Sequence, residues 1–127
     1  MVLVDTSIWI RSFRGLAPYA DELDRLLSRD EVAGHDLVLG ELLIGDRGAR
    51  ASRLSGYERI WRAGSVPHAE VVAFVRERKL PGRGLGWIDV HLLASALVGR
   101  LRFWTADAPL IAAASDLGIA YSAPRPS

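Results

Sequence analysis

Four carboxylic acids in this chain follow predicted strands or lie on predicted helices, where they could act together. Asp5 ends the apolar run 2–4, and Asp107 comes just after the strand predicted over 102–105. Asp89 lies in the first turn of a helix predicted over 87–98, and Glu41 lies inside one predicted over 36–44. Acids that converge repel one another unless a cation lies between them, and ligation by oxygen alone favours Mg²⁺ or Mn²⁺ over zinc. The chemistry to test is therefore that of a divalent metal site.

Three of these acids also have an ordinary structural explanation. Taken alone, Asp5 is better explained as the N-cap of the helix that follows it. Asp107 precedes Pro109, and proline is tolerated in a first helical turn that an aspartate caps. Asp89 complements the dipole of its own helix. None of the three indicates a metal site by itself.

Glu41 is harder to explain in this way. Its helical neighbours at i−4, i−3 and i+3 are Leu37, Val38 and Ile44, so we expect its side chain to emerge from an apolar stripe. A carboxylate buried there is costly unless it is paired. An arginine or a metal ion would satisfy it. Asp89 poses the same problem, with apolar residues at i+3 and i+4 and no base within its own turn.

The order of elements predicts the fold that must position these acids. Short apolar runs alternate with longer stretches of helical periodicity. We expect strands at 2–4, 31–34, 102–105 and 119–121, a brief extended piece at Val66, and helices starting after Asp5 and at 67–68, as well as over 18–28, 36–44, 48–62, 87–98 and 107–117. This alternation predicts an α/β three-layer sandwich, with a short parallel sheet and helices on both faces. Ligands bind such sheets at the carboxyl ends of the strands, the edge where the four acids should meet.

Composition narrows the class of protein. The chain has 127 residues, of which 50% are hydrophobic and 24% charged, which is typical of one compact domain over 1–127. We expect its last residues, 123–127, to form a frayed tail. The absence of cysteine excludes disulfides, thiol nucleophiles and cysteine zinc sites, and favours a reducing, cytoplasmic setting. The first residues lack a basic signal-peptide region, and no apolar run approaches the ~20 residues that span a bilayer. We expect neither secretion by signal peptide nor membrane insertion.

The basic residues suggest a second, weaker hypothesis. The formal net charge is only +1, but setting aside the four acids leaves 11 acids against 16 bases, a formal +5. Arginines recur every three residues on the helix predicted after Glu41, and further basic residues precede the Asp89 helix. The RNA-binding candidates are Arg47, Arg50, Arg53 and Arg83. A solvated basic face and a nucleic-acid surface explain this pattern about equally well.

The histidines and glycines do not suggest a second site. His91 lies two residues from Asp89, and residues at i and i+2 on a helix do not face the same way, so a structural role is favoured. His35 and His68 have no metal-ligand spacing with it. The glycines at 82, 84 and 86 fit neither G-x-G-x-x-G nor the Walker pattern, which favours a hinged loop over a nucleotide cradle.

With these residues in view, the chain resembles the PIN-domain ribonucleases and, among them, the VapC-type toxins of toxin–antitoxin pairs. The resemblance rests on residues 4–9, 40–42, 84–95 and 101–107, which read VDTSIW, GEL, GLGWIDVHLLAS and LRFWTAD. These stretches cover the chain from end to end in the order that the family has. Four acids with these flanking residues make a more specific signal than any one of them alone.

The resemblance implies an endoribonuclease that leaves a 5′-phosphate and a 3′-hydroxyl. It implies that Asp5, Glu41, Asp89 and Asp107 hold one or two Mg²⁺ or Mn²⁺ ions and are the catalytic residues. It further implies that the hydroxyls of Thr6, Ser7 or Thr105 support them. The partners that it implies are an RNA substrate, a cognate antitoxin and a second copy of the chain in a homodimer.

Other classes of protein can also carry aspartates at this edge of a parallel sheet. A receiver-type phosphoacceptor would need a lysine after a late strand, but Lys79, the only lysine, follows a helix. An aspartyl-phosphate phosphatase would need D-x-D after the first strand, where this chain has Asp5-Thr6-Ser7. The main alternative is a non-catalytic module on the same fold that binds RNA or a partner protein.

Overall fold

The computed structural model of the chain describes residues 1–45 and 51–124, apart from the side chains of 51–53. The predictions for Arg47 and Arg50, for the start of the helix at 48 and for the tail at 125–127 lie outside the described residues. For Arg53 only the backbone is described, within a helix.

The sheet at the centre of the fold consists of short, buried, parallel strands. These are β1 (Val2–Val4), β2 (Val32–Ala33) and β3 (Arg102–Trp104), in the order β2-β1-β3. Val2 lies opposite Val32 on one side and Arg102 on the other. All three residues of β1 are buried, as expected of a central strand with helices on both faces. Because the strands are parallel, β1 and β3 end at the same edge, where Asp5 and Thr105 follow them.

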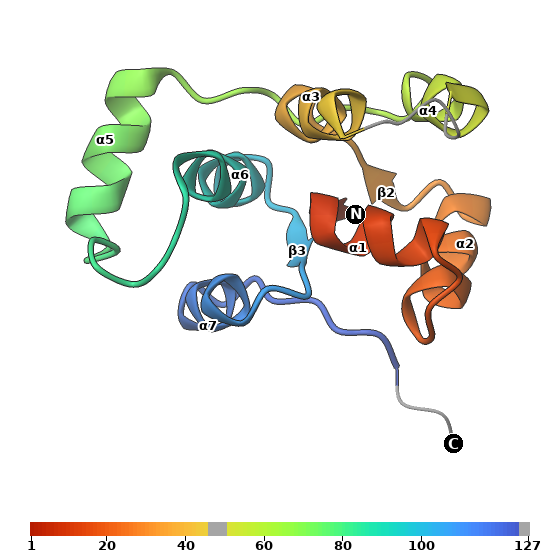
Figure 1. Cartoon of the computed structure of the whole chain (residues 1–127). Helices are drawn as coiled ribbons and strands as arrows, with labels where there is room; N and C mark the ends of the chain where they lie inside the picture. The colour runs from red at the N-terminus through yellow and green to blue at the C-terminus, as the bar shows by residue number, and fades with distance from the viewer. Residues whose placement is uncertain (46–50, 125–127) are drawn as a thin grey trace.

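Seven helices within the described residues surround this sheet. They are α1 (Thr6–Phe13), α2 (Tyr19–Ser28), α3 (Asp36–Ile44), α4 (Ala51–Tyr57), α5 (His68–Glu77), α6 (Trp87–Val98) and α7 (Ala108–Asp116). In Figure 1, α1 and α2 lie to the right of β3, and α6 and α7 lie to its left. Helix α3 packs against α1 and α4, and α5 packs against the outer side of α6. The architecture is the α/β three-layer sandwich that the sequence predicts.

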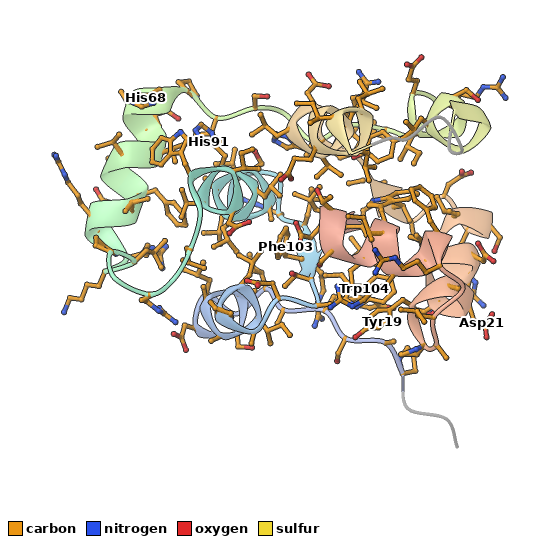
Figure 2. The ribbon with its side chains drawn as sticks, in the orientation of Figure 1. Tyr19, Asp21, His68, His91, Phe103 and Trp104 are labelled. Carbon is orange, nitrogen blue, oxygen red and sulfur yellow. The ribbon has the colours of Figure 1, made fainter. Side chains whose placement is uncertain are left out.

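The core lies between the sheet and the helices that flank it. Leu3 and Val4 of β1, Leu92 and Leu93 of α6 and Leu110 of α7 are fully buried. Figure 2 shows Phe103 and Trp104 inside the molecule at β3. The apolar residues of α6 make it the buried helix predicted over 87–98. Within the described residues, no helix is both long and apolar enough to cross a membrane.

Two predicted elements are shorter than expected. The helix predicted over 48–62 ends at Tyr57, because the chain then turns and joins the edge of the sheet. There Gly34 N–H donates to Trp61 C=O (2.8 Å) and Ala63 N–H donates to Gly34 C=O (2.9 Å). The extended bridge in this segment therefore lies at Arg62, not at Val66.

The strand predicted over 119–121 is reduced to a single bridge, between Ala120 and Phe103. It runs parallel to β3 and uses two backbone hydrogen bonds, from Phe103 N–H to Ile119 C=O and from Tyr121 N–H to Phe103 C=O. The side chain of Tyr121 also hydrogen-bonds Glu22 on α2, which fixes the end of the described chain against that helix.

Candidate metal centre

Asp5 lies at the carboxyl end of β1, and its side chain is 6% exposed. It occupies the N-cap position of α1 but makes no side-chain capping hydrogen bond. Its Oδ2 instead accepts two hydrogen bonds of 2.8 Å, one from Ser7 Oγ and one from Thr105 Oγ1. The capping explanation for Asp5 is therefore wrong. Its carboxylate is held by the hydroxyls of Ser7 and Thr105 and not by the backbone of α1.

The two hydroxyls that hold Asp5 are themselves fixed by the loop after β3. Ser7 Oγ accepts a hydrogen bond from Ala106 N–H (3.0 Å), and Thr105 Oγ1 accepts one from Asp107 N–H (3.1 Å). Because each hydroxyl accepts from the backbone, its proton is available to donate to Asp5. The same contacts fix the backbone that carries Asp107 relative to Asp5.

Glu41 lies on α3 and is half-buried. Its Oε1 accepts a hydrogen bond of 2.7 Å from Thr6 Oγ1 at the start of α1. Burial raises the pKa of Glu41, and the nearby carboxylates of Asp5 and Asp89 raise it further. The expected apolar stripe around Glu41 is only partly present. Val38 is buried, but Ile44 is 91% exposed because the last turn of α3 extends beyond the core.

Asp89 and Asp107 each make a capping contact at the start of a helix, and both lie at the carboxyl edge of the sheet. Asp89 Oδ2 accepts a hydrogen bond of 2.8 Å from Gly86 N–H, just before α6. Asp107 Oδ2 accepts a longer one of 3.3 Å from Leu110 N–H and so caps α7. Burial raises the pKa of Asp89, with smaller contributions from the charges of Asp5 and Asp107. The four acids are thus close enough to influence one another electrostatically.

No described base neutralises this group of carboxylates. The ion pairs among the described residues lie elsewhere, and none involves Asp5, Glu41, Asp89 or Asp107. Across those residues, no three His, Cys, Asp or Glu side chains are grouped tightly enough to hold an ion as they stand. The donor chemistry nevertheless fits a divalent cation, because it consists of carboxylate oxygens whose mutual repulsion such an ion would relieve.

The basic residues proposed for RNA binding are only partly visible. Of that set, only Arg83 has a described side chain, and its guanidinium pairs with Asp116 on α7 at 2.7 Å. Gly84, at φ +77°, lies in the same loop, where a Cβ would come 3.6 Å from Pro109. The loop 81–86 therefore packs against the start of α7, beside Asp107.

One histidine has a role near this site that the sequence did not predict. His35 is fully buried, caps α3 through its ring and contacts Ser95 on α6. A signal was present, since His35 directly precedes α3, where Ser, Thr, Asp or Asn would ordinarily cap a helix. The other two histidines pack around Trp87 between α5 and α6, where His68 and His91 are labelled in Figure 2.

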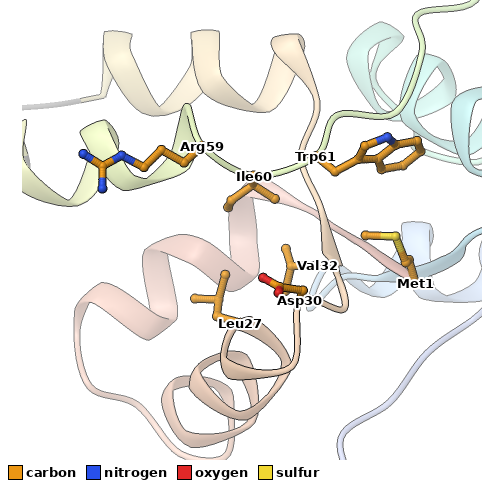
Figure 3. Close-up of a pocket in the computed structure, with 7 residues that line it drawn as sticks. All are labelled: Met1, Leu27, Asp30, Val32, Arg59, Ile60 and Trp61. Atoms are coloured by element: carbon orange, nitrogen blue, oxygen red, sulfur yellow. The ribbon is translucent and has the colours of Figure 1, made fainter.

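Two pockets lie away from the four acids. One, of about 360 Å³, lies near the amino ends of β1 and β2, the opposite edge of the sheet (Figure 3). Met1, Val32, Ile60 and Trp61 are among the residues that line it. Another, of about 350 Å³, lies between α1 and α2. None of the four acids lines either pocket.

Comparisons with known proteins agree with the fold. A family model described as the PIN domain matches residues 2–115. Ribonuclease VapC32 of Mycobacterium tuberculosis, from strains CDC 1551 / Oshkosh and ATCC 25618 / H37Rv, is 43% identical over 124 residues. The match covers 96% of this chain and 97% of the relative.

Solved structures share the same fold at lower sequence identity. FitAcB from Neisseria gonorrhoeae superimposes with a TM-score of 0.62 at 22% identity, over 91% of this chain and 94% of that one. PAE2754 from Pyrobaculum aerophilum gives a TM-score of 0.59 at 20% identity, over 88% and 83%.

The chain belongs to the PIN-domain family. Within that family it is a VapC-type ribonuclease, as its identity to VapC32 over nearly the whole of both chains shows. The family resemblance predicted from the sequence is therefore confirmed.

Proposed function

We propose that this protein is a divalent-metal-dependent endoribonuclease that acts as the toxin of a toxin–antitoxin pair. Its catalytic and metal-binding residues are Asp5, Glu41, Asp89 and Asp107. The observation that carries this assignment is the meeting of the four carboxylates at the carboxyl edge of the sheet, where Asp5 is buried, Glu41 and Asp89 are half-buried, and no described arginine or lysine pairs with any of them. Its context is a chain that is 43% identical to a ribonuclease.

The residues of this chain prepare the site before any ligand binds. Ser7 and Thr105 hold Oδ2 of Asp5, so the carboxylate keeps one orientation. Thr6 holds one oxygen of Glu41, and Gly86 N–H holds one oxygen of Asp89. In each case the other oxygen accepts no hydrogen bond from a described residue. Ligands fixed in this way lose little conformational freedom when they bind a cation.

PIN-domain nucleases generally depend on divalent ions, and this donor set fits Mg²⁺ or Mn²⁺. When bound, such an ion lowers the pKa of a water molecule and neutralises charge on the phosphate that is cut. The carboxylates would hold the positive charge of the ion at the carboxyl edge of the sheet. No histidine or lysine is needed as a general acid in this scheme.

The proposal includes partners beyond the RNA substrate. A cognate antitoxin protein would bind the toxin and block it, and two copies of the chain would form a homodimer. The cytoplasm is the setting where RNA and such a partner would be met. The arginines at 47, 50, 53 and 83 remain candidates for RNA contact, with Arg83 available only if it leaves Asp116.

The test is digestion of RNA by the purified protein, in EDTA and in Mg²⁺ or Mn²⁺, with Asp89→Asn as the comparison. The wild type should cut RNA only with the ion and leave 5′-phosphate ends. The variant should lose at least ~100-fold of the rate, since even residues behind metal ligands cost 10- to 100-fold. RNA binding without cleavage by the metal-loaded wild type would favour a non-catalytic module. Wild-type cleavage by the variant would make the assignment of the acids wrong.

A further inference from the structure

His35 joins two helices that carry proposed metal ligands. Its side chain is 1% exposed and lies at the N-cap of α3. The Nδ1 atom accepts a hydrogen bond from Leu37 N–H (3.0 Å), so the ring proton is on Nε2. Nε2 therefore donates to Ser95 Oγ on α6, at 2.9 Å. One rigid ring thus caps α3 and holds it to α6.

The backbone of His35 is fixed just as firmly. The hydroxyl of Tyr57, at the end of α4, accepts a hydrogen bond from His35 N–H (2.8 Å) and donates one to His35 C=O (3.2 Å). This close approach favours glycine at 34, where a Cβ would come within 3.2 Å of the tyrosine ring. Because both the backbone and the ring of His35 are held, a movement of α3 relative to α6 must break one of these contacts.

We propose that His35 is a positioning residue, and that its hydrogen bond to Ser95 sets the distance between Glu41 and Asp89. We refer to this hydrogen bond as the His35–Ser95 tie. The inference rests on the proposed function, in which Glu41 and Asp89 hold the same metal centre. It assigns His35 and Ser95 no contact with RNA or with the ion.

The spacing along the two helices supports this role. Glu41 lies six residues after His35, and Asp89 lies six residues before Ser95. At a rise of 1.5 Å per residue, each acid is about 9 Å along its helix from the tie. The charge of Asp89 raises the pKa of Glu41, so the two acids are near each other. The two helices are therefore joined at the tie and bring their acids near each other about 9 Å further along.

Histidine suits this task better than an ordinary capping residue. A serine or aspartate at position 35 would accept the hydrogen bond from Leu37 N–H, but its side chain is too short to span both helices. The neutral imidazole offers an acceptor and a donor on opposite edges of a flat ring. Burial lowers the pKa of His35, which keeps the ring in this neutral form.

The experiment measures the dissociation constant for Mn²⁺ by calorimetry in variants that lose the tie but keep the cap. Ser95→Ala removes the acceptor of the tie, and His35→Asn keeps a capping oxygen while giving up the reach to Ser95. The matched control is Tyr121→Phe, which removes a hydroxyl hydrogen bond to Glu22 on α2 and touches neither His35 nor Ser95. Melting temperatures and RNA cleavage across a range of Mn²⁺ concentrations accompany each titration.

If the tie sets the distance between Glu41 and Asp89, Ser95→Ala and His35→Asn each weaken Mn²⁺ binding about 3- to 10-fold, at the low end of effects seen behind metal ligands. The double variant is no worse than either single one, because both changes remove the same hydrogen bond. Cleavage then needs more Mn²⁺ to reach half its maximal rate, while the maximal rate is largely kept. Tyr121→Phe lowers the melting temperature without changing the dissociation constant.

The inference is overturned if the tie variants lose thermal stability as Tyr121→Phe does but bind Mn²⁺ as the wild type does. In that case His35 only stabilises the fold, and the proposed function still stands if the wild type binds Mn²⁺ and Asp89→Asn does not. A wild type that binds no Mn²⁺ would overturn the proposed function itself, and the inference with it. The two failures are therefore distinguishable.

Discussion

The hydroxyl of Thr105 donates a hydrogen bond of 2.8 Å to Oδ2 of Asp5, one hundred residues earlier in the chain. The two residues follow β3 and β1, which are paired in register as parallel neighbours. Both side chains are buried, and the oxygen that donates to Asp5 also accepts a hydrogen bond from Asp107 N–H. One hydroxyl therefore connects two of the four acids across the edge of the sheet.

Replacing Thr105 with valine should weaken both the fold and the site. Valine has nearly the same shape, but it removes one donor to Asp5 and leaves Asp107 N–H without its acceptor. We expect the free energy of unfolding to fall by about 1–3 kcal/mol, the cost of leaving buried polar groups unsatisfied. Urea denaturation in EDTA measures this loss.

Thr105→Ser is the matched control, because it keeps the hydroxyl and removes only a methyl group. It should retain most of the stability and of the metal affinity that Thr105→Val loses. A loss in Thr105→Ser without a loss in Thr105→Val would mean that Thr105 acts through packing of its methyl group and not through Asp5.

The sequence could predict where the acids lie along the chain but not what holds them. Asp5, Asp89 and Asp107 occupy positions next to strands or helix starts, and such positions follow from apolar runs and turn residues. The parallel sheet then requires the first and last of them to meet at one edge. These predictions depend on local sequence patterns and on the rule that parallel strands end at the same edge of a sheet.

The contacts that the sequence could not predict join residues far apart in the chain. Nothing near Ser7 indicates that its hydroxyl accepts from Ala106 N–H, and nothing near His35 indicates Ser95 as its partner. The end of α4 was missed for the same reason. Tyr57 ends that helix in contact with His35, and the chain beyond it bonds to Gly34.

The raised pKa of Asp89 leads to a prediction about pH. An acid whose pKa is raised by folding favours the folded state at low pH, and this contribution is lost as the pH rises through the raised pKa. Asp89→Asn has no carboxyl group at this position, so its stability does not fall with pH for this reason. In EDTA, the melting temperature of the variant minus that of the wild type should therefore increase as the pH rises from about 4, the usual value for aspartate, toward 7.

Taking the difference between the two proteins removes the effect of groups that do not interact with Asp89, such as Glu22, whose pKa is lowered by its hydrogen bond with Arg25. Melting curves at half-unit steps of pH measure this difference in melting temperature. A difference that stays constant over this range, or that falls as the pH rises, would contradict the view that burial and neighbouring acids raise the pKa of Asp89.

A partner that inhibits the enzyme should compete with metal. The group of acids carries negative charge and no described counter-ion, so an arginine from an antitoxin would bind there through charge-assisted hydrogen bonds. We expect higher Mg²⁺ concentrations to weaken inhibition of RNA cleavage by the antitoxin. Inhibition measured at several Mg²⁺ concentrations tests this, and a constant inhibitory concentration would place the antitoxin away from Asp5.

The effect of Asp89→Asn on stability separates the metal site from simple helix capping. Asparagine keeps an oxygen that can accept the hydrogen bond from Gly86 N–H, but it removes the charge that repels Asp5 and Asp107. In EDTA at neutral pH, the variant should therefore melt at or above the temperature of the wild type. Asp89→Ala loses the cap as well, and should be less stable than Asp89→Asn by about 0.5–2 kcal/mol.

Adding Mg²⁺ or Mn²⁺ should reverse the order of the wild type and Asp89→Asn. An ion that binds only the folded form stabilises it by ~2.7 kcal/mol at a hundred times its dissociation constant, so the wild-type midpoint should rise by several degrees. The midpoint of Asp89→Asn should hardly change, whereas Asp21→Asn, on the exposed side of α2, should respond as the wild type does. A wild type indifferent to divalent ions, with Asp89→Asn less stable in EDTA, would leave Asp89 as a capping residue only. The main physical argument for a metal-dependent nuclease would then be lost.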